Sequence, residues 1–329
     1  MILVTGGTGF LGAHVVRALL LRGETVRCLV RETSPRTNLD RLAVEIAVGD
    51  LNDPPSLARA VRGAHAIYHC AADYRLFARK RREVFRTNVA GTDNLLRAAA
   101  DAAIERVVYT SSVGTLGRKC NADPADETTP VSRSEMIGAY KTSKFDAERI
   151  AESWARRGLP VVIVNPSTPV GELDVKPTPT GRMIVDFLNG RMPAYVDTGL
   201  NLIDARDVAE GHLLAAKRGR VGEKYILGNR NMSLKEIFDA LASLTGLPSP
   251  RVRLPSWIPI AVGALDTAIA RVAGREPRVA LDAARMSRHR MYFDSSKAVR
   301  ELGLPQSPLE DALARAVAWF REHGYVRRG

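Results

Sequence analysis

A glycine-rich loop near the start of the chain constrains the fold more than any other feature. It joins a short apolar segment, Ile2–Thr5, to a segment with helical periodicity, Phe10–Arg22, and it carries Gly6, Gly9 and Gly12. Glycines at this spacing let the backbone turn tightly and approach a pyrophosphate at the helix N-terminus, where free N–H groups favour an anion. A strand, a loop and a helix in this order therefore predict a dinucleotide-binding α/β fold.

The first half of the chain alternates short apolar runs with longer runs of helical periodicity. The expected strands are Ile2–Thr5, Thr25–Val30, Val44–Val48, Ala66–Cys70, Arg106–Ser111 and Val161–Asn165, and the helices are Phe10–Arg22, Pro55–Val61, Arg82–Ala102 and Gly138–Arg157. Continuous apolar strands are typical of a parallel sheet that helices cover on both faces. We therefore expect a doubly wound parallel Rossmann sheet.

The second half of the chain has a different sequence pattern. The stretch Pro166–Thr180 is rich in proline and predicts a loop that leaves the sheet. The expected elements after it are helices at Ala205–Lys217, Ser233–Thr245, Ile258–Val272, Leu281–Arg288, Ser295–Leu302 and Leu309–Gly324, with one strand at Lys224–Leu227. We expect a dinucleotide-binding domain of residues 1–165, to which 200–228 return. Residues 166–199 and 229–329 would form a smaller, mostly helical substrate-binding lobe.

Composition argues against a disulfide-rich, a metal-binding or a nucleic-acid-binding protein. The 329 residues are 45% hydrophobic and 26% charged, as in ordinary globular chains. Three cysteines without a CxxC pair and six histidines without HExxH spacing predict neither a disulfide framework nor a metal site. The net charge of +12 comes without a nucleic-acid-binding motif, so no nucleic acid partner is expected. The absence of a leader and of a long apolar run predicts a cytoplasmic protein.

One segment near the C-terminus has an apolar stripe with basic flanks. The stripe is Ile258, Val262, Leu265, Ile269 and Val272, and the flanking residues are Arg251, Arg253, Arg271 and Arg275. A helix packed in the lobe commonly shows this pattern, which favours a core interpretation. A helix lying in a membrane interface shows it too, so peripheral membrane contact stays open as a hypothesis.

The residues after the second expected strand bear on the type of dinucleotide. About 20 residues past the glycine loop, an acid would bind a ribose 2′-hydroxyl, whereas an arginine would pair with a 2′-phosphate. Arg31 stands there, Arg36 follows nearby, and Glu32 keeps NAD(H) possible. Because a guanidinium is a bidentate phosphate partner, NADP(H) is favoured.

A tyrosine, a lysine and a serine form the candidate catalytic set. Tyr140 and Lys144 lie about one turn apart on one face of an expected helix. A neighbouring ammonium lowers the pKa of a phenol from its usual value of about 10, which helps the phenol exchange a proton. Ser111 and Ser112 close the fifth strand, where ligands of such sheets bind, and a hydroxyl there can hold a reacting oxygen.

These motifs together resemble the extended short-chain dehydrogenases/reductases over essentially the whole chain. The matching segments are TGGTGFLG at 5–12, HCAA at 69–72, NVxGT at 88–92, TSS at 110–112, YKTSK at 140–144 and NP at 165–166. Segments 165–171, 175–181 and 187–193 resemble most the hopanoid-associated sugar epimerase group, close to dihydroflavonol-4-reductase-like proteins.

The resemblance implies a role for each matching residue. Tyr140 would be the acid/base, Lys144 its electrostatic partner and a ribose ligand, and Ser112 the hydroxyl that holds the oxygen. Gly6, Gly9, Phe10, Leu11 and Gly12 would line the pyrophosphate, Asp50 and Leu51 the adenine, and Ala71 and Ala72 the nicotinamide. The expected cofactor contacts also include Arg31, Tyr140, Lys144 and Pro166.

Two departures from the superfamily narrow the expected reaction. Ser112 is not followed by the Asp-Glu pair of sugar-nucleotide 4,6-dehydratases, and Asn165 replaces the arginine usual in sugar epimerases. We expect an NAD(P)-dependent oxidoreductase that transfers hydride at a carbinol or ketone carbon, and the resemblance implies hopanoid lipid metabolism. A nucleotide-sugar epimerase that retains NAD and a non-catalytic NADP-sensing protein stay open. The partner would be a carbonyl compound, a nucleotide sugar or a hopanoid-linked polyol, and a homodimer is common in the superfamily.

Overall fold

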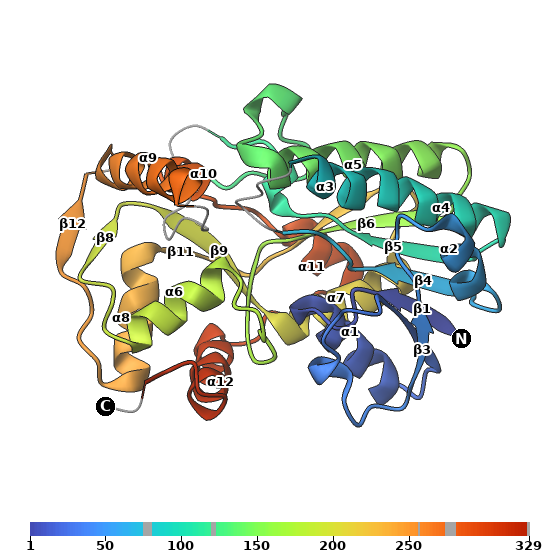
Figure 1. Ribbon diagram of the computed structural model, residues 1–329, viewed down its shortest axis with the longest axis horizontal. Coiled ribbons are helices and arrows are strands. Elements are labelled where there is room, and N and C mark those ends of the chain that lie inside the picture. The colour runs from blue at the N-terminus through green and yellow to red at the C-terminus, as the bar shows by residue number, and fades with distance from the viewer. Residues whose placement is uncertain (75–80, 120–122, 256, 274–280, 328–329) are drawn as a thin grey trace.

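A seven-stranded parallel sheet forms the centre of the computed structural model, which describes residues 1–74, 81–119, 123–255, 257–273 and 281–327. The strands are β1 (Ile2–Thr5), β2 (Val26–Val30), β3 (Val44–Val48), β4 (Ala66–His69), β5 (Arg106–Thr110), β6 (Val161–Pro166) and β10 (Lys224–Leu227). Their order is β10-β6-β5-β4-β1-β2-β3, so β1 lies between β2 and β4 and the winding reverses there (Figure 1). The predicted doubly wound Rossmann sheet is confirmed.

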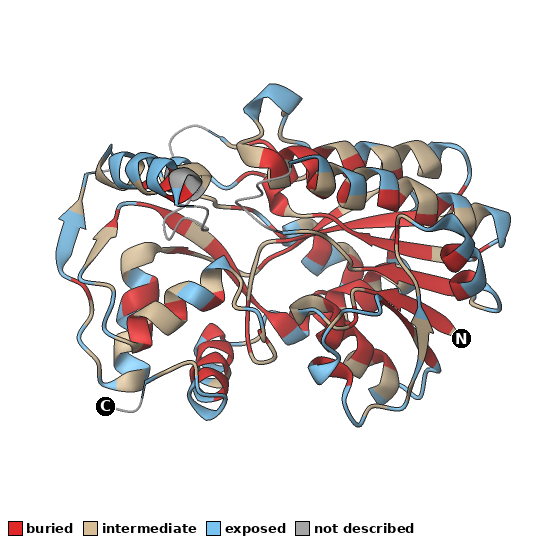
Figure 2. Cartoon of the chain, in the orientation of Figure 1, coloured by how far each residue is buried: buried red, intermediate tan, exposed pale blue. Residues whose placement is uncertain are grey.

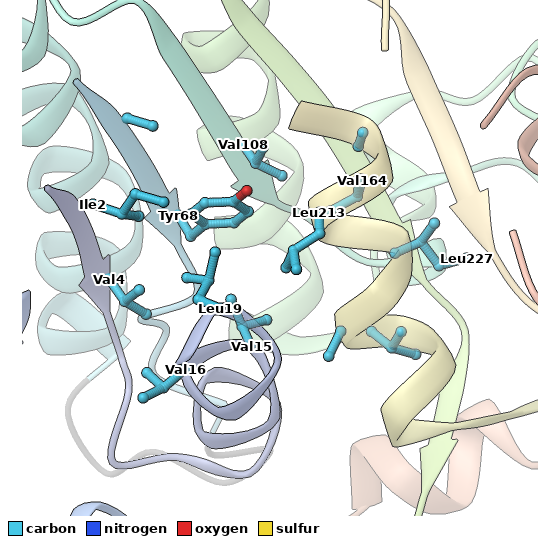
Figure 3. Packing of buried hydrophobic residues seen from close by; sticks show 14 of the residues in the cluster. Ile2, Val4, Val15, Val16, Leu19, Tyr68, Val108, Val164, Leu213 and Leu227 are labelled. Atoms are coloured by element: carbon cyan, nitrogen blue, oxygen red, sulfur yellow. The ribbon is translucent and has the colours of Figure 1, made fainter. Parts of the chain in front are cut away.

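Helices cover both faces of this sheet. One layer contains α1 (Phe10–Leu21), α7 (Ala205–Arg218) and α11 (Ser296–Leu302), and the other contains α2 (Pro54–Val61), α3 (Arg81–Phe85), α4 (Gly91–Asp101) and α5 (Gly138–Arg156). Along β1, Ile2 and Val4 pack into the first layer and Leu3 into the second. Both faces of the strand are therefore buried, which explains its continuous apolar sequence. Figure 3 shows the hydrophobic core between the sheet and the first layer, where side chains of β1, β4, β5 and β6 pack against α1 and α7.

Elements of the second half build a further hydrophobic core beside the sheet. Its helices are α6 (Pro179–Leu188), α8 (Leu234–Thr245) and α12 (Leu309–Glu322), and its strands are β7 (Thr168–Val170), β8 (Ala194–Val196), β9 (Gly199–Asp204) and β11 (Arg230–Ser233). The short strand β12 (Val252–Leu254) lies outside this core. The strands form one sheet in the order β11-β9-β7 and a pair, β12-β8. The exact division of the chain into domains stays a prediction.

Several local expectations differ from the structure. Besides the expected helices and the expected strand β10, the second half contains α6, β8, β9, β11 and β12. The segment expected to be a loop, Pro166–Thr180, contains β7, which pairs in parallel with β9. Three residues that include Pro169 carry no detectable period, so the strand could not be recognised from the sequence. The helix expected at Arg82–Ala102 is divided, because a π-helical segment, Arg86–Ala90, separates α3 from α4.

The apolar stripe lies on α9 (Trp257–Val272), which packs against α10 (Leu281–Met286). Three of its side chains face solvent, since Val262, Leu265 and Ile269 are 49%, 64% and 49% exposed. The residues that α9 buries are Gly263, Thr267 and Ala270. The core interpretation is therefore wrong for these three stripe residues. The side chains of Arg271 and Val272, and all of Arg275, lie outside the described residues. Among the described residues, no helix is long and apolar enough to cross a membrane.

Candidate functional site

The carboxyl ends of the parallel strands bring the expected site residues to one edge of the sheet. Thr5 at the end of β1 lies level with Leu29 of β2 and with His69 of β4, and His69 lies level with Tyr109 of β5. The loops that follow these strands hold the glycine motif, Arg31, Ala71 and Ala72, and Ser111 and Ser112. Ligands of open α/β sheets bind at this edge, next to the point where the strand order reverses.

The glycine loop packs so closely against neighbouring backbone that two of its positions have no room for a side chain. A Cβ at Gly6, whose φ is +75°, would lie 2.6 Å from the Ala71 nitrogen, and a Cβ at Gly12 would collide with the Gly6 carbonyl oxygen. Helix α1 begins at Phe10 after an N-cap, Gly9, that offers no side chain, and its first turn contains no acid. The first N–H groups of a helix have no partner inside it, so this N-terminus fits an anion.

The other expected cofactor residues follow the ends of strands. Arg31 comes directly after β2 and is exposed. Asp50 follows β3, and its carboxylate accepts hydrogen bonds from the Asn52 backbone N–H and side-chain amide at 2.8 and 2.9 Å. Leu51 is the next residue, and its side chain is buried. Pro166 is the buried last residue of β6.

Helix α5 holds the candidate tyrosine and lysine in its first two turns. Lys144 is buried, and its ammonium donates to the Thr110 carbonyl oxygen at 2.6 Å and to the Tyr109 hydroxyl at 3.0 Å. Burial lowers the pKa of Lys144 to about 8, while the carboxylate of Glu148 opposes that shift. Burial raises the pKa of the Tyr140 phenol above its usual value, and the polar contact with the Ser112 side chain offsets only part of that shift. The structure therefore brings Tyr140 to the Ser112 side chain, while the Lys144 ammonium is bonded to Tyr109 and Thr110 at the end of β5.

The two neighbouring serines have different surroundings. The Ser112 hydroxyl is half-buried, accepts a hydrogen bond from the Gly114 N–H at 3.0 Å, and contacts Tyr140. The Ser111 hydroxyl is buried and donates to the Glu148 carboxylate at 2.5 Å. Ser112 is consequently the serine that faces the tyrosine, and Ser111 belongs to a network behind it.

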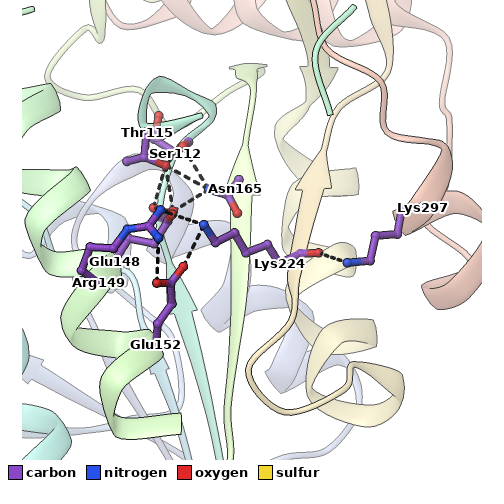
Figure 4. A network of polar contacts seen from close by, with 9 residues as sticks. Ser112, Thr115, Glu148, Arg149, Glu152, Asn165, Lys224 and Lys297 are labelled. Atoms are coloured by element: carbon purple, nitrogen blue, oxygen red, sulfur yellow. Dashed lines mark hydrogen bonds and ion pairs between the residues drawn. The ribbon is translucent and has the colours of Figure 1, made fainter. Parts of the chain in front are cut away.

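Glu148 organises this network, and the sequence analysis missed it. The carboxylate is fully buried and accepts hydrogen bonds from the Thr115 hydroxyl at 2.7 Å and the Asn165 amide at 2.8 Å (Figure 4). Both donors also bond to the Ser112 carbonyl oxygen, at 2.8 and 3.1 Å. The Lys224 ammonium lies 2.7 Å from the other carboxylate oxygen. Burial pushes the pKa of Glu148 up, but Lys224 and the hydrogen bonds outweigh it and hold the pKa below its usual value.

His69 is a structural residue of the strand end. Its ring nitrogens lie 2.7 Å from the Thr5 hydroxyl and 3.0 Å from the Thr92 hydroxyl, so both are hydrogen-bonded. Burial lowers the pKa of His69 to about 3, with a smaller contribution from the charge of Lys144. A neutral, fully bonded imidazole supports the sheet edge and has no proton to exchange near neutral pH.

The fold and this edge of the sheet define a class, the nicotinamide-dinucleotide-dependent enzymes of the short-chain dehydrogenase/reductase type. The family follows from comparison with known sequences. The family described as "NAD dependent epimerase/dehydratase family" matches residues 2–228, and the chain belongs to it.

Two relatives are similar over almost the whole chain. A Synechocystis protein named "Putative dihydroflavonol 4-reductase" is 50% identical and covers 98% of this chain and 95% of its own length. A Methylococcus capsulatus protein named "Sterol demethylase protein B" is 40% identical, and 98% of this chain and 99% of that protein are covered.

Solved structures agree with the fold. The crystal structure of gox2253 is 48% identical, covers 99% of both chains and superposes with a TM-score of 0.89. A dTDP-glucose 4,6-dehydratase from Streptomyces venezuelae, solved with NAD bound, is 28% identical. It covers 99% of this chain and 98% of its own, with a TM-score of 0.78.

Proposed function

We propose that this enzyme is an NAD(P)-dependent reductase that acts at a ketone or carbinol carbon and exchanges its nucleotide in every turnover. The observation that carries the proposal is the contact between Tyr140 and Ser112, with the buried ammonium of Lys144 one helical turn further along α5 and bonded to the Thr110 carbonyl oxygen. A proton donor, an oxygen-holding hydroxyl and a nearby cation are what carbonyl reduction requires of a protein.

Each residue has one task in this reaction. A bound nicotinamide supplies the hydride to the substrate carbon, or accepts it in the reverse direction. Ser112 donates a hydrogen bond to the carbonyl oxygen, and Tyr140 gives that oxygen its proton as negative charge develops. Lys144, one helical turn further along α5, favours the phenolate that remains and would hold the nicotinamide ribose.

The nucleotide would lie along the edge of the sheet. Its pyrophosphate would meet the N-terminus of α1 at the glycine loop, with Asp50 and Leu51 at the adenine and Ala71, Ala72 and Pro166 at the nicotinamide. Arg31 follows β2 without an ion pair in the described part of the chain, so its guanidinium is available to a 2′-phosphate. This arrangement supports NADP(H) over NAD(H).

The substrate class rests on the names of the relatives and on Asn165. Asn165 stands where sugar epimerases usually carry an arginine, and its amide is bonded to Glu148 and to the Ser112 carbonyl. The two relatives described above are named as a dihydroflavonol reductase and as a sterol demethylase protein. We infer a polycyclic carbonyl substrate, with the cytoplasm as the location and hopanoid lipid metabolism as the setting.

The decisive experiment separates exchange of the nucleotide from its retention. The protein is purified without added nucleotide and denatured, and the released nucleotide is quantified. An empty protein that binds NADPH and consumes it with a carbonyl substrate supports the proposal. Near-stoichiometric NAD⁺, with sugar-nucleotide interconversion that needs no added cofactor, would instead identify a retaining epimerase. Nucleotide binding without turnover of either substrate class would indicate a sensor.

A further inference from the structure

Helix α9 presents an apolar face to solvent. Its large exposed side chains are Trp257, Val262, Leu265 and Ile269, which are 67%, 49%, 64% and 49% exposed. Figure 2 shows the helix at the upper left, where much of its ribbon is coloured as exposed. Large apolar side chains that cluster in this way mark an interaction surface more often than isolated ones do.

The exposed residues of this face carry no charge, and the acid of α9, Asp266, is half-buried four residues after Val262. Among the residues of α9 whose side chains are described, all the exposed ones are apolar. They are Trp257, Ala261, Val262, Ala264, Leu265, Ala268 and Ile269. A helix on the surface of a globular protein usually places charged residues on its outer face. In α9 the inner face is instead formed by the small residues Gly263 and Ala270 with Thr267, and the large residues point outward.

The surroundings of α9 are basic. Exposed arginines precede it at Arg251 and Arg253 and follow α10 at Arg288 and Arg290. Arg253 and Arg290 share the Asp197 carboxylate at 2.7 and 2.9 Å, and Arg285 pairs with Asp282 at 3.8 Å. With Arg251 and Arg288 added, the arginines around α9 and α10 outnumber the acids Asp197, Asp266 and Asp282 in the described chain. An apolar helix face with basic neighbours has the chemistry of a segment that lies in the interface of an anionic membrane.

The helix pair formed by α9 and α10 borders the site. A Cβ at Gly138, the first residue of α5, would lie 2.6 Å from the Asp282 carboxylate of α10. Beyond α10, the Met291 sulfur lies 4.0 Å from the ammonium of Lys141, the neighbour of Tyr140. A membrane that contacts α9 would therefore lie next to the element that holds the candidate tyrosine.

We propose that α9 docks this protein on an anionic lipid surface. A second copy of the chain is a poorer occupant, because a stable interface buries about 800 Å² on each partner and includes hydrogen bonds. The exposed face of α9 consists of four large apolar residues and three alanines, and it offers no side-chain donors besides the Trp257 indole. A lipid surface requires neither a fixed register nor a matching set of donors.

The test is co-sedimentation with vesicles at low salt. Wild-type protein is mixed with vesicles of phosphatidylcholine alone or with one quarter phosphatidylglycerol. We expect binding to the anionic vesicles, weaker binding at 0.5 M salt, and at least a tenfold loss of binding in the double variant Val262→Gln/Leu265→Gln. The matched control, Leu21→Gln/Val221→Gln, changes two side chains that are 88% and 48% exposed elsewhere and should bind like wild type.

Two further readouts keep the proposal falsifiable. Trp257 should shift its fluorescence to the blue on anionic vesicles, and Trp257→Phe should remove that shift while the protein still sediments. Failure of wild type to sediment, or an equal loss of binding in the control variant, would refute the proposal. So would a dimer in lipid-free ultracentrifugation that the α9 variant disrupts, because α9 would then contact a second copy. These measurements record binding alone, so their failure would leave the proposed reaction untouched.

Discussion

The Glu148 carboxylate accepts a hydrogen bond from the Ser111 hydroxyl across 2.5 Å, which joins helix α5 to the end of strand β5. Glu148 lies eight residues after Tyr140 on the same helix, and Ser111 directly precedes Ser112. The Thr115 hydroxyl lies within hydrogen-bond distance of both the same carboxylate and the Ser112 carbonyl oxygen, and it shares its one proton between these two acceptors. The two groups that would contact the reacting oxygen are thus held relative to one another by a carboxylate that touches neither of their side chains.

Glu148→Gln should slow turnover about tenfold, equivalent to about 1.4 kcal/mol, with little change in nucleotide affinity. The amide keeps the size of the side chain but loses one acceptor and the negative charge. Because that charge raises the pKa of Lys144, which is about 8 in the intact site, its removal lowers this pKa further. The alkaline limb of the pH profile of kcat should therefore move to lower pH.

Glu152→Gln is the control for this prediction. Glu152 also pairs with Lys224, at 2.8 Å, but it has no hydrogen bond with Ser111 or Thr115 in the described network. A pH profile that shifts equally in both variants would show that only the charge balance around Lys224 matters. Thermal melting of both variants records any separate loss of stability.

Tyr140→Phe should abolish turnover and leave nucleotide affinity within a few-fold of wild type. The ring of the half-buried side chain can pack as before, whereas the proton needed in the transition state is gone. Steady-state kinetics and titration with NADPH measure the two effects separately. Turnover close to wild type would eliminate the proposed mechanism.

The sheet and its glycine loop could be predicted because their signals are local. The strand Ile2–Thr5 is an unbroken apolar run, and both of its faces are buried as such runs predict. The lobe strands β8 and β12 have three residues each, too few to show a period of two. For α9, periodicity reveals an amphipathic helix but cannot tell whether the large or the small residues face the core.

In the candidate site, too, some residues can be recognised from a local sequence pattern and others only from the tertiary structure. Tyr140 and Lys144 are related by one helical turn, and this spacing points to them in combination with the glycine loop and the serines that close the fifth strand. Ser111 and Ser112 are adjacent, and only the tertiary contact with Glu148 distinguishes their roles. That residue follows Lys144 by four positions, a helical spacing that could have drawn attention to it. Its other partners, such as Asn165, come from distant strands that no local pattern connects.

Asp174 should make stability depend on pH in the weakly acidic range. It is buried next to the N-terminus of α6, where it accepts hydrogen bonds from the Thr178 N–H and hydroxyl. Burial raises the pKa of Asp174 to about 6, and the hydrogen bonds oppose that shift. Since the pKa is about 4 in an unfolded chain, the contribution of this group is fully present below pH 4. It is lost as the pH rises through 6.

Asp174→Asn removes this titration and measures it. Relative to wild type, its free energy of unfolding should rise by about 2 to 3 kcal/mol between pH 4 and pH 7, given about 1.4 kcal/mol for each pKa unit. Urea unfolding at several pH values provides the comparison. Asp40→Asn changes an exposed carboxylate and controls for the loss of one charge. A difference between Asp174→Asn and wild type that stays constant with pH would contradict the expectation.

Arg31→Ala should weaken the binding of NADPH by about 1.5 to 3 kcal/mol, the contribution of a hydrogen bond to a charged group, and should hardly affect NADH. Arg31 is exposed directly after β2, at the place where the adenosine ribose of a nucleotide bound to the glycine loop would lie. Arg59→Ala, an exposed arginine on α2, is the control for the loss of one positive charge. Calorimetry that finds equal losses for NADPH and NADH would mean that Arg31 does not contact the 2′-phosphate. A selective loss for NADPH would connect this position to the cellular reductant pool that a nucleotide-exchanging reductase uses.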